Sequence, residues 1–204
     1  MNRYPPTHRY SPAHRRALTA VCILATALGP AACAADEKPA ATASAGVAPS
    51  PTAGSPGFFG GTDLAWVEIT IAMDEELLPL LTLVPANGSD PALKALSAEV
   101  TGVHERELTA LRGLHDQADL PAENPHKGMP MPGMVTPEQV TAAAATRGKA
   151  FDDLVRGHLE AHLRQGLRLA ESERKSGIEP QTRALADDVL RTRRTYLNRL
   201  GKAS

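Results

Sequence analysis

Two histidines, His158 and His162, are the residues in this sequence best suited to bind a metal ion. They are four positions apart, and residues at that spacing lie on the same face of a helix, one turn apart. Two neutral imidazoles in that arrangement suit a first-row metal ion. Glu160 would lie on the opposite side of the helix, so the pair is not the zinc-protease motif in which a glutamate acts as the base. The alternative is a histidine pair at a helix interface, hydrogen-bonded to a carboxylate or to water.

His104 and Glu107 form a second polar pair, three positions apart. Di-metal helical bundles carry the opposite order, Glu-x-x-His, together with further glutamates, so di-iron oxidation chemistry is not predicted. The alternative interpretation is a polar interruption at the edge of a helix, in which Glu105 and Glu107 are solvated beside Arg106.

A methionine-rich segment follows, and it holds His126, Met129, Met131 and Met134 among prolines and glycines. Thioether sulfur is a soft ligand that favours Cu(I). Methionine also fills irregular gaps over a hydrophobic core. The segment is therefore predicted either to contact copper or to cover one part of the core.

Other kinds of chemistry find no support in the sequence. It has no Ser-His-Asp spacing, glycine-rich phosphate loop, Cys-x-x-Cys pair or nucleophile elbow, and we therefore expect no enzyme. A net charge of −1 without a basic stripe gives no basis for nucleic-acid binding. Aromatic residues make up only 3% of the chain, so the core must be aliphatic.

The first 34 residues have the layout of a bacterial export signal: a basic stretch, a short apolar run and small residues. Cys33 lies where a lipobox would place the lipidated cysteine, which predicts an exported protein anchored to the cell membrane through that residue. Cleavage after Ala34, giving a freely secreted protein, is the alternative. Residues 35–61 are rich in Ala, Pro, Ser and Gly and are predicted to form a disordered tether.

The remainder of the chain, 62–201, contains an internal repeat. Residues 90–111 align without a gap on 179–200, at an offset of 89 positions. A repeat of this size indicates two copies of one unit that cannot bury its apolar face alone. We predict an all-α, ferritin-like four-helix bundle made of two repeated helical hairpins, 62–115 and 150–201, joined by a methionine-rich linker at 116–135.

The helix boundaries are predicted from caps and apolar periodicity. Helices are expected over 62–84, with Pro79 as a kink or early end, and from Asp90 into the 110s after a turn at 85–88. A short helix should begin at Thr136 and break near Gly148. Two further long helices are expected over 151–176 and from Glu179 to Leu200.

A group of motifs resembles the bacterial family named domain of unknown function 305. These are His-x-x-Met-x-x-x-Gly-Met-x-Thr-Pro-Glu-Gln over 126–139, Phe-Asp-x-Leu over 151–154, and Ala-Leu-Ala after a Pro cap. The resemblance implies a duplicated ferritin-like fold that is commonly exported or lipid-anchored, with copper binding in some relatives.

The resemblance also implies metal-binding positions, because the family carries a Met-x-x-His-His motif in each half. The two histidines of the second motif fall on His162 and Leu163, and those of the first fall on Met73 and Asp74. The paired histidines are therefore missing from both halves, as in a diverged member with an eroded site. A Gln-x-x-Glu pair of the family falls on His104 and Glu107 in the first half, and on Arg193 and Tyr196 in the second.

Two hypotheses of function follow. The first is an exported, membrane-tethered, non-catalytic bundle that acts as a binding or interaction module and requires no cofactor. The alternative is an extracytoplasmic protein that binds copper or another first-row ion. Its ligands would be His162 and His158, the methionine-rich segment would form a lid, and the facing candidates are Met73, Asp74, His104 and Glu107.

Overall fold

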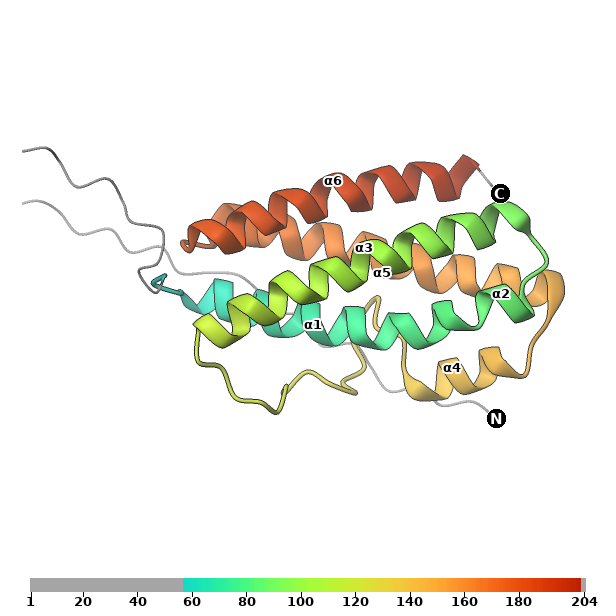
Figure 1. Ribbon diagram of the computed structural model, residues 1–204, viewed down its shortest axis with the longest axis horizontal. Coiled ribbons are helices and arrows are strands. Elements are labelled where there is room, and N and C mark those ends of the chain that lie inside the picture. The colour runs from blue at the N-terminus through green and yellow to red at the C-terminus, as the bar shows by residue number, and fades with distance from the viewer. Residues whose placement is uncertain (1–56, 203–204) are drawn as a thin grey trace, which may run out of the picture. The chain divides into compact units, whose positions relative to one another are not determined.

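The computed structural model describes residues 57–202, so the predicted leader, Cys33 and nearly all of the tether lie outside the described residues. Within this range the chain forms helices and no strand. The helices, shown in Figure 1, are α1 (Gly61–Thr82), α2 (Val84–Asn87), α3 (Pro91–Gln117), α4 (Pro137–Ala144), α5 (Gly148–Ser176) and α6 (Pro180–Lys202).

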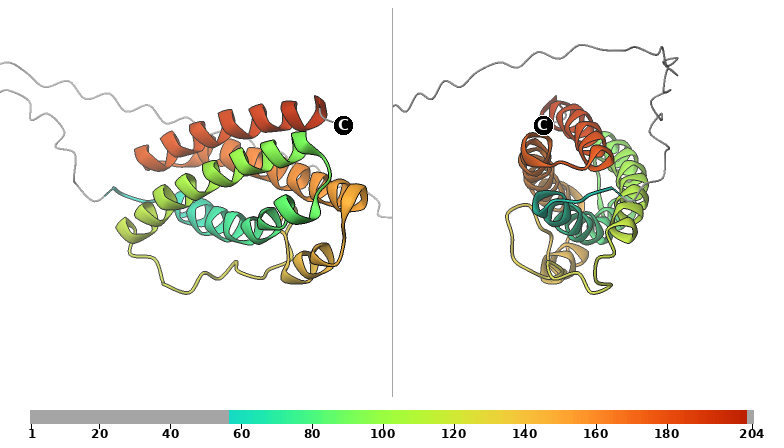
Figure 2. Two further views of the ribbon diagram at one scale, coloured as in Figure 1. Left: turned by 45° about the vertical axis from the view of Figure 1, so that its right-hand side comes forward. Right: turned by 90° about the vertical axis from the view of Figure 1, so that its left-hand side faces the viewer.

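Four long helices form the bundle, and the end-on view of Figure 2 shows them surrounding a common centre. α1 packs against α3 and α5, while α6 packs against α5 and α3. The first hairpin is thus α1 with α3, and the second is α5 with α6. Short α4 lies outside this arrangement and contacts α1 and α5. The prediction of an all-α four-helix bundle made of two hairpins is confirmed.

Matching caps begin the second helix of each hairpin, as the repeat predicts. The Asp90 carboxylate accepts a hydrogen bond of 2.8 Å from the backbone N–H of Ala92, and the Glu179 carboxylate accepts one of 2.5 Å from the backbone N–H of Thr182. In both cases proline occupies the first helical position, where its missing N–H costs no hydrogen bond. Each cap therefore fixes where its helix starts.

Some boundaries differ from the predictions. The segment expected to be a turn at 85–88 contains the short helix α2, because Pro85 stands in its first turn, where proline is tolerated. α1 continues past Pro79 to Thr82. α5 begins at Gly148, whose φ of +62° suits a residue without a side chain, so this glycine starts α5 rather than only ending the preceding helix.

The core has two large apolar clusters with a polar layer between them. One cluster lies toward the α2 end and includes Leu80, Leu93 and Phe151. The other lies toward the start of α1 and includes Trp66 and Leu111. Between them, each long helix contributes a buried polar side chain; these are Asp74, His104, Glu107, His162 and Arg193. No helix within residues 57–202 is both long enough and apolar enough to cross a bilayer.

Candidate metal centre

Asp74, His104 and His162 converge at the middle of the bundle from α1, α3 and α5. The Nε2 atoms of the two histidines are 3.0 Å apart. Asp74 Oδ1 lies 3.3 Å from Nε2 of His162 and 3.6 Å from Nε2 of His104. The bundle therefore brings three potential metal ligands together from three different helices.

The tautomer of His104 follows from its other ring nitrogen. Nδ1 lies 2.9 Å from the carbonyl oxygen of Val100, one turn earlier on α3. A carbonyl oxygen only accepts, so Nδ1 carries the proton and donates it, which leaves a lone pair on Nε2. A hydrogen bond from the second ring nitrogen to a backbone carbonyl is also how metal-bound histidines are usually oriented. The Nε2 lone pair of His104 thus faces His162 and Asp74.

Burial sets the charge of these three groups. Together with the positive charge of Arg193, it lowers the pKa of His162 to about 3. Burial and Arg193 likewise place the pKa of His104 well below its usual value. Burial raises the pKa of Asp74 to about 6 against the opposing effect of Arg193. At neutral pH both imidazoles are therefore uncharged and Asp74 is ionised.

Arg193 of α6 completes the polar layer. Its Nη1 donates to Glu107 Oε2 at 2.9 Å and its Nη2 donates to Glu107 Oε1 at 2.7 Å. Nη2 also lies 3.3 Å from Asp74 Oδ1. Arg193 is completely buried, so its charge is balanced within the bundle rather than by solvent. Burial raises the pKa of Glu107, whereas the two hydrogen bonds from the guanidinium oppose that rise.

The structure corrects the interpretation of Glu107 as a solvated residue on a helix edge. It is only 6% exposed because Arg193 draws its carboxylate inward, and Arg193 itself did not emerge from the sequence as a central residue. The internal repeat contained a signal for it, since Arg193 is 89 positions after His104. Gly166 of α5 provides the space: a Cβ there would lie 3.0 Å from Arg193 Nε.

Two other predicted ligands lie outside the three-residue group. His158 is half-buried on α5 and does not join Asp74, His104 and His162. Met73 is buried, but it packs in a small apolar cluster with Ala72 and Met134. The predicted ligand set is therefore brought together in part, with Glu107 linked to the group through Arg193.

The methionine-rich segment runs along the bundle next to His162. Gly133, with φ of +80°, passes so close to α5 that a Cβ there would lie 3.2 Å from Cα of His162 and 2.8 Å from the carbonyl oxygen of Ala161. Met134 is buried and Met131 is half-buried in the cluster with Met73. The segment thus covers the bundle beside His162, which agrees with the predicted role of covering one part of the core.

The beginning of this segment is more exposed. His126 is half-buried and its backbone N–H donates to Asn124 Oδ1 at 2.9 Å. Met129 is 45% exposed. Neither residue contributes to the group formed by Asp74, His104 and His162. A metal contact at the exposed end would therefore be separate from the centre.

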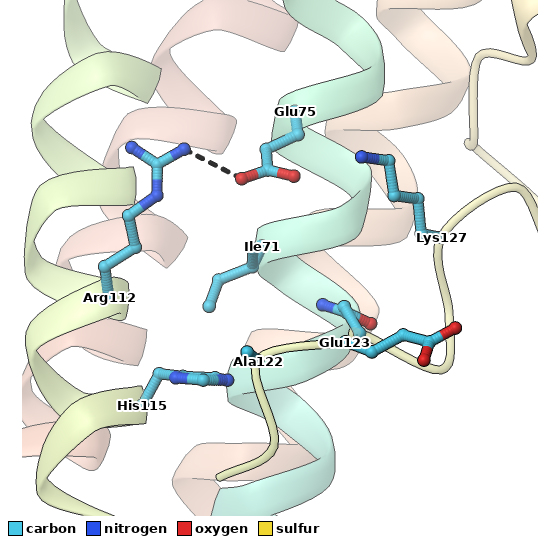
Figure 3. Close-up of a pocket in the computed structure, with 8 residues that line it drawn as sticks. Ile71, Glu75, Arg112, His115, Ala122, Glu123 and Lys127 are labelled. Carbon is cyan, nitrogen blue, oxygen red and sulfur yellow. Dashed lines mark hydrogen bonds and ion pairs between the residues drawn. The ribbon is translucent and has the colours of Figure 1, made fainter.

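Two surface clefts lie near the centre. The larger, about 440 Å³, is formed by α1, α3 and the loop after α3. Arg112 and Glu75 form an ion pair of 2.7 Å at this cleft, and Figure 3 shows the pair together with Lys127, which comes from the loop. A second cleft of about 320 Å³ between α3 and α6 reaches Glu107. Neither cleft is lined by Asp74, His104 or His162, so the three candidate ligands are enclosed by protein.

The size of the ligand triangle can be compared with a metal site. Bonds of about 2.0–2.1 Å in tetrahedral geometry hold ligand atoms about 3.3 Å apart. The three separations here are 3.0, 3.3 and 3.6 Å. In addition, Asp74 Oδ2 and His162 Nδ1 are buried without a hydrogen-bond partner. The residues present therefore fit one face of a tetrahedral site.

The chain belongs to the family described as domain of unknown function (DUF305), whose model matches residues 63–203. This confirms the family suggested by the motifs. Among curated proteins, no relative matches the chain.

Solved structures with the same fold are distant in sequence. A DUF305 fragment from Deinococcus radiodurans is 11% identical with a TM-score of 0.63, covering 71% of this chain and 95% of its own. A DUF305 protein from Streptomyces coelicolor is 17% identical with a TM-score of 0.60, covering 68% and 89%. CopM in its Cu(I)-bound form is 17% identical with a TM-score of 0.59, covering 70% and 95%. At these identities the likeness establishes the fold alone.

Proposed function

We propose that this protein is an extracytoplasmic, non-catalytic metal-binding bundle that holds one ion of the copper type through Asp74, His104 and His162. The observation that carries the proposal is the triangle of three buried ligand atoms, with edges of 3.0, 3.3 and 3.6 Å. Imidazole and carboxylate ligands suit first-row ions. The metal-binding hypothesis therefore takes precedence over an interaction module without a cofactor.

The protonation states of the ligands support this function. With its proton on Nδ1, His104 can only accept at Nε2, so the 3.0 Å contact with His162 requires a proton or a cation between the two Nε2 atoms. A metal ion could take the place of that proton once the proton of neutral His162 has moved from Nε2 to Nδ1, which leaves a lone pair on Nε2. Because burial keeps both imidazoles uncharged at neutral pH, neither histidine would have to release a proton when the ion binds.

A structural relative supports the choice of ion. CopM, which shares the fold at 16–18% identity, has been solved in Cu(I)-bound, Cu(II)-bound and Ag-bound forms. That a DUF305-like bundle holds these ions in one protein makes copper the first ion to test in this one. The ligands proposed here rest on the geometry of this chain.

The enclosure of the centre favours binding over catalysis. Asp74, His104 and His162 are at most 1% exposed, and the two clefts beside the centre are lined by other residues. A substrate would have no place next to a bound ion. The export signal predicted over residues 1–34, with Cys33 as its lipid-anchor candidate, would place this binding function outside the cytoplasm.

Titration calorimetry of the mature chain with Cu(I) and Cu(II) tests the function. One ion per chain should bind to the wild type, and His162→Gln should abolish that binding. His158→Gln is the matched control, because His158 is one turn away on the same helix but outside the centre. Binding that survives His162→Gln, or that His158→Gln removes equally, would overturn the assignment of the site and leave the interaction module as the working hypothesis.

A further inference from the structure

We infer that Arg193 restricts the centre to a monovalent ion, so that the protein takes a soft, singly charged coinage-metal ion of the Cu(I) class in preference to divalent ions. This inference rests on the proposed function and names the kind of ion that the same centre accepts. It assigns to Arg193 the role of a specificity-determining residue that does not itself bind the metal.

The position of Arg193 gives it this influence. The guanidinium donates at 2.9 and 2.7 Å to Glu107, and the same Nη2 lies 3.3 Å from Asp74 Oδ1, one of the proposed ligand atoms. Arginine does not lose its proton in proteins. A permanent positive charge is therefore fixed beside the site, where no solvent screens it.

The charges of the polar layer determine which ion would leave that layer without a net charge. The bidentate contact of 2.9 and 2.7 Å pairs the charge of Arg193 with the Glu107 carboxylate. Asp74 is then the one carboxylate of the layer whose charge remains for a bound ion. A monovalent ion brings the layer to neutrality, whereas a divalent ion leaves an excess positive charge between two apolar clusters, where an unbalanced charge is costly.

The internal repeat shows which position of the first hairpin corresponds to Arg193. Arg193 stands 89 positions after His104, so the second hairpin places a guanidinium where the first places an imidazole. In the second hairpin, a permanently charged guanidinium therefore stands at the position where a second histidine ligand would lie. This arrangement fits one ion per chain.

An independent observation favours a soft ion. Three of the five methionines of the chain, Met73, Met131 and Met134, pack together where the segment carrying Gly133 lies against His162. Thioethers bind Cu(I) and bind hard divalent ions poorly. The neighbouring side chains thus suit the same monovalent ion as the charge balance.

The test compares Ag(I) and Zn(II), two redox-inert ions that differ in charge, by titration calorimetry of the mature chain in chloride-free buffer. The quantity measured is the ratio of the two affinities, counting only binding that His162→Gln removes. Wild type should prefer Ag(I). Arg193→Gln adds one net negative charge to the layer and should shift the ratio at least tenfold toward Zn(II).

Two variants serve as matched controls. The double variant Arg193→Gln with Glu107→Gln removes one charge of each sign, so it should keep the wild-type ratio. Arg193→Lys keeps the positive charge and should also keep it. Circular dichroism spectra identify the variants that fold. Should Arg193→Gln alone not fold, Glu107→Gln provides the opposite test, because removing a negative charge should shift the ratio further toward Ag(I).

The possible failures are distinguishable. If neither ion binds in a manner that depends on His162, the proposed function fails. If one ion binds through His162 but the affinity ratio is the same in wild type, Arg193→Gln and Glu107→Gln, the metal site stands and the charge inference is overturned. A wild type that prefers Zn(II) would also overturn it.

Discussion

The Nε2 atoms of His104 and His162 lie 3.0 Å apart, although the two histidines belong to different hairpins of the duplicated chain. Their contact crosses the interface between the hairpins, from α3 to α5. Since α1 and α6 bring Asp74 and Arg193 to the same point, one polar layer joins all four long helices. Such a layer can fix the alignment of the hairpins, because any shift would leave buried charges unpaired.

The ion pair between Arg193 and Glu107 yields the first prediction, which concerns stability. Arg193→Met should lower the free energy of unfolding by about 3–5 kcal/mol, because it leaves the Glu107 carboxylate buried without a partner. Urea denaturation at neutral pH measures this change. Adding Glu107→Leu should restore part of the loss, because it removes the unpaired Glu107 carboxylate while Asp74 still lacks the guanidinium that lies 3.3 Å from its Oδ1.

The neighbouring residue Arg194 provides the control. It pairs with Glu171 at 3.2 Å on the surface, where ion pairs contribute about 0–1 kcal/mol. Arg194→Met should therefore leave the urea midpoint nearly unchanged. Equal effects of the two methionine substitutions would contradict the importance of the buried pair.

The second prediction compares two glycines of the methionine-rich segment that share a positive φ. Gly128 has φ of +74° and Gly133 has φ of +80°. A Cβ on Gly128 would meet nothing within 4 Å, whereas one on Gly133 would lie 2.6 Å from Cβ of Gln165. Gly128→Ala should cost about 1–2 kcal/mol from the backbone conformation alone. Gly133→Ala should cost about 2–4 kcal/mol, because the steric clash adds to it.

Thermal denaturation of both alanine variants measures the difference, and limited proteolysis reports whether the segment has left the bundle. We expect faster cleavage within residues 126–134 only in Gly133→Ala. If the two variants melt together and are cleaved at the same rate, the segment does not depend on the close approach of Gly133 to α5.

Much of the fold was predictable because it depends on local signals. The caps Asp90-Pro91 and Glu179-Pro180 repeat at the offset of 89, and apolar periodicity with these caps gave the approximate boundaries of the long helices. The short helix α2 was missed because Pro85 is common both in turns and in the first turn of a helix.

The centre was less predictable because its residues meet across helices. His162, Asp74 and His104 were candidates from spacing and family motifs, but spacing alone also made His158 a candidate beside His162. Residues four positions apart on a helix point in slightly different directions, and the packing of α5 decides which of the two histidines faces the core. The role of Arg193 depends on a partner 86 positions away, and no local pattern reveals such a pair.

The third prediction concerns acid stability and the carboxylate of Asp152. It accepts hydrogen bonds at 3.1 Å from the backbone N–H groups of Ser89 and Asp90, which ties the start of α5 to the start of α3. Burial alone would raise the pKa of Asp152, but these bonds and the hydroxyl of Ser89 hold it below its usual value. Because the folded pKa is depressed, this stabilisation is present above the unfolded pKa and is lost as pH falls through the folded pKa.

Asp152→Asn should therefore cost about 1–2 kcal/mol at neutral pH, and the wild type and variant should converge in stability as pH falls through the folded pKa of Asp152. Urea unfolding followed from pH 2.5 to 7 measures both. Asp153→Asn is the control, since its carboxylate pairs only with exposed Lys149. A constant gap between Asp152→Asn and wild type over the whole range would contradict the linkage.

The fourth prediction concerns alkaline stability and the carboxyl group of Glu173, at the end of α5. Glu173 is fully buried beside Asp63, whose carboxylate accepts a hydrogen bond of 3.0 Å from the backbone of Ile178 in the α5–α6 connection. Burial first, and then the neighbouring Asp63, raises the pKa of Glu173 to about 8. The folded pKa is above the unfolded value, so the favourable contribution is complete below the unfolded pKa and is lost as pH rises through about 8.

The melting temperature of the wild type should consequently fall between pH 5 and pH 9 by more than that of Glu173→Gln, because glutamine stays neutral and can still donate to Asp63. Differential scanning calorimetry at several pH values measures both slopes. Glu171→Gln removes an exposed carboxylate two residues away and should retain the wild-type slope. If Glu173→Gln also retains it, Glu173 is ionised throughout the range and the α5–α6 connection is insensitive to its charge.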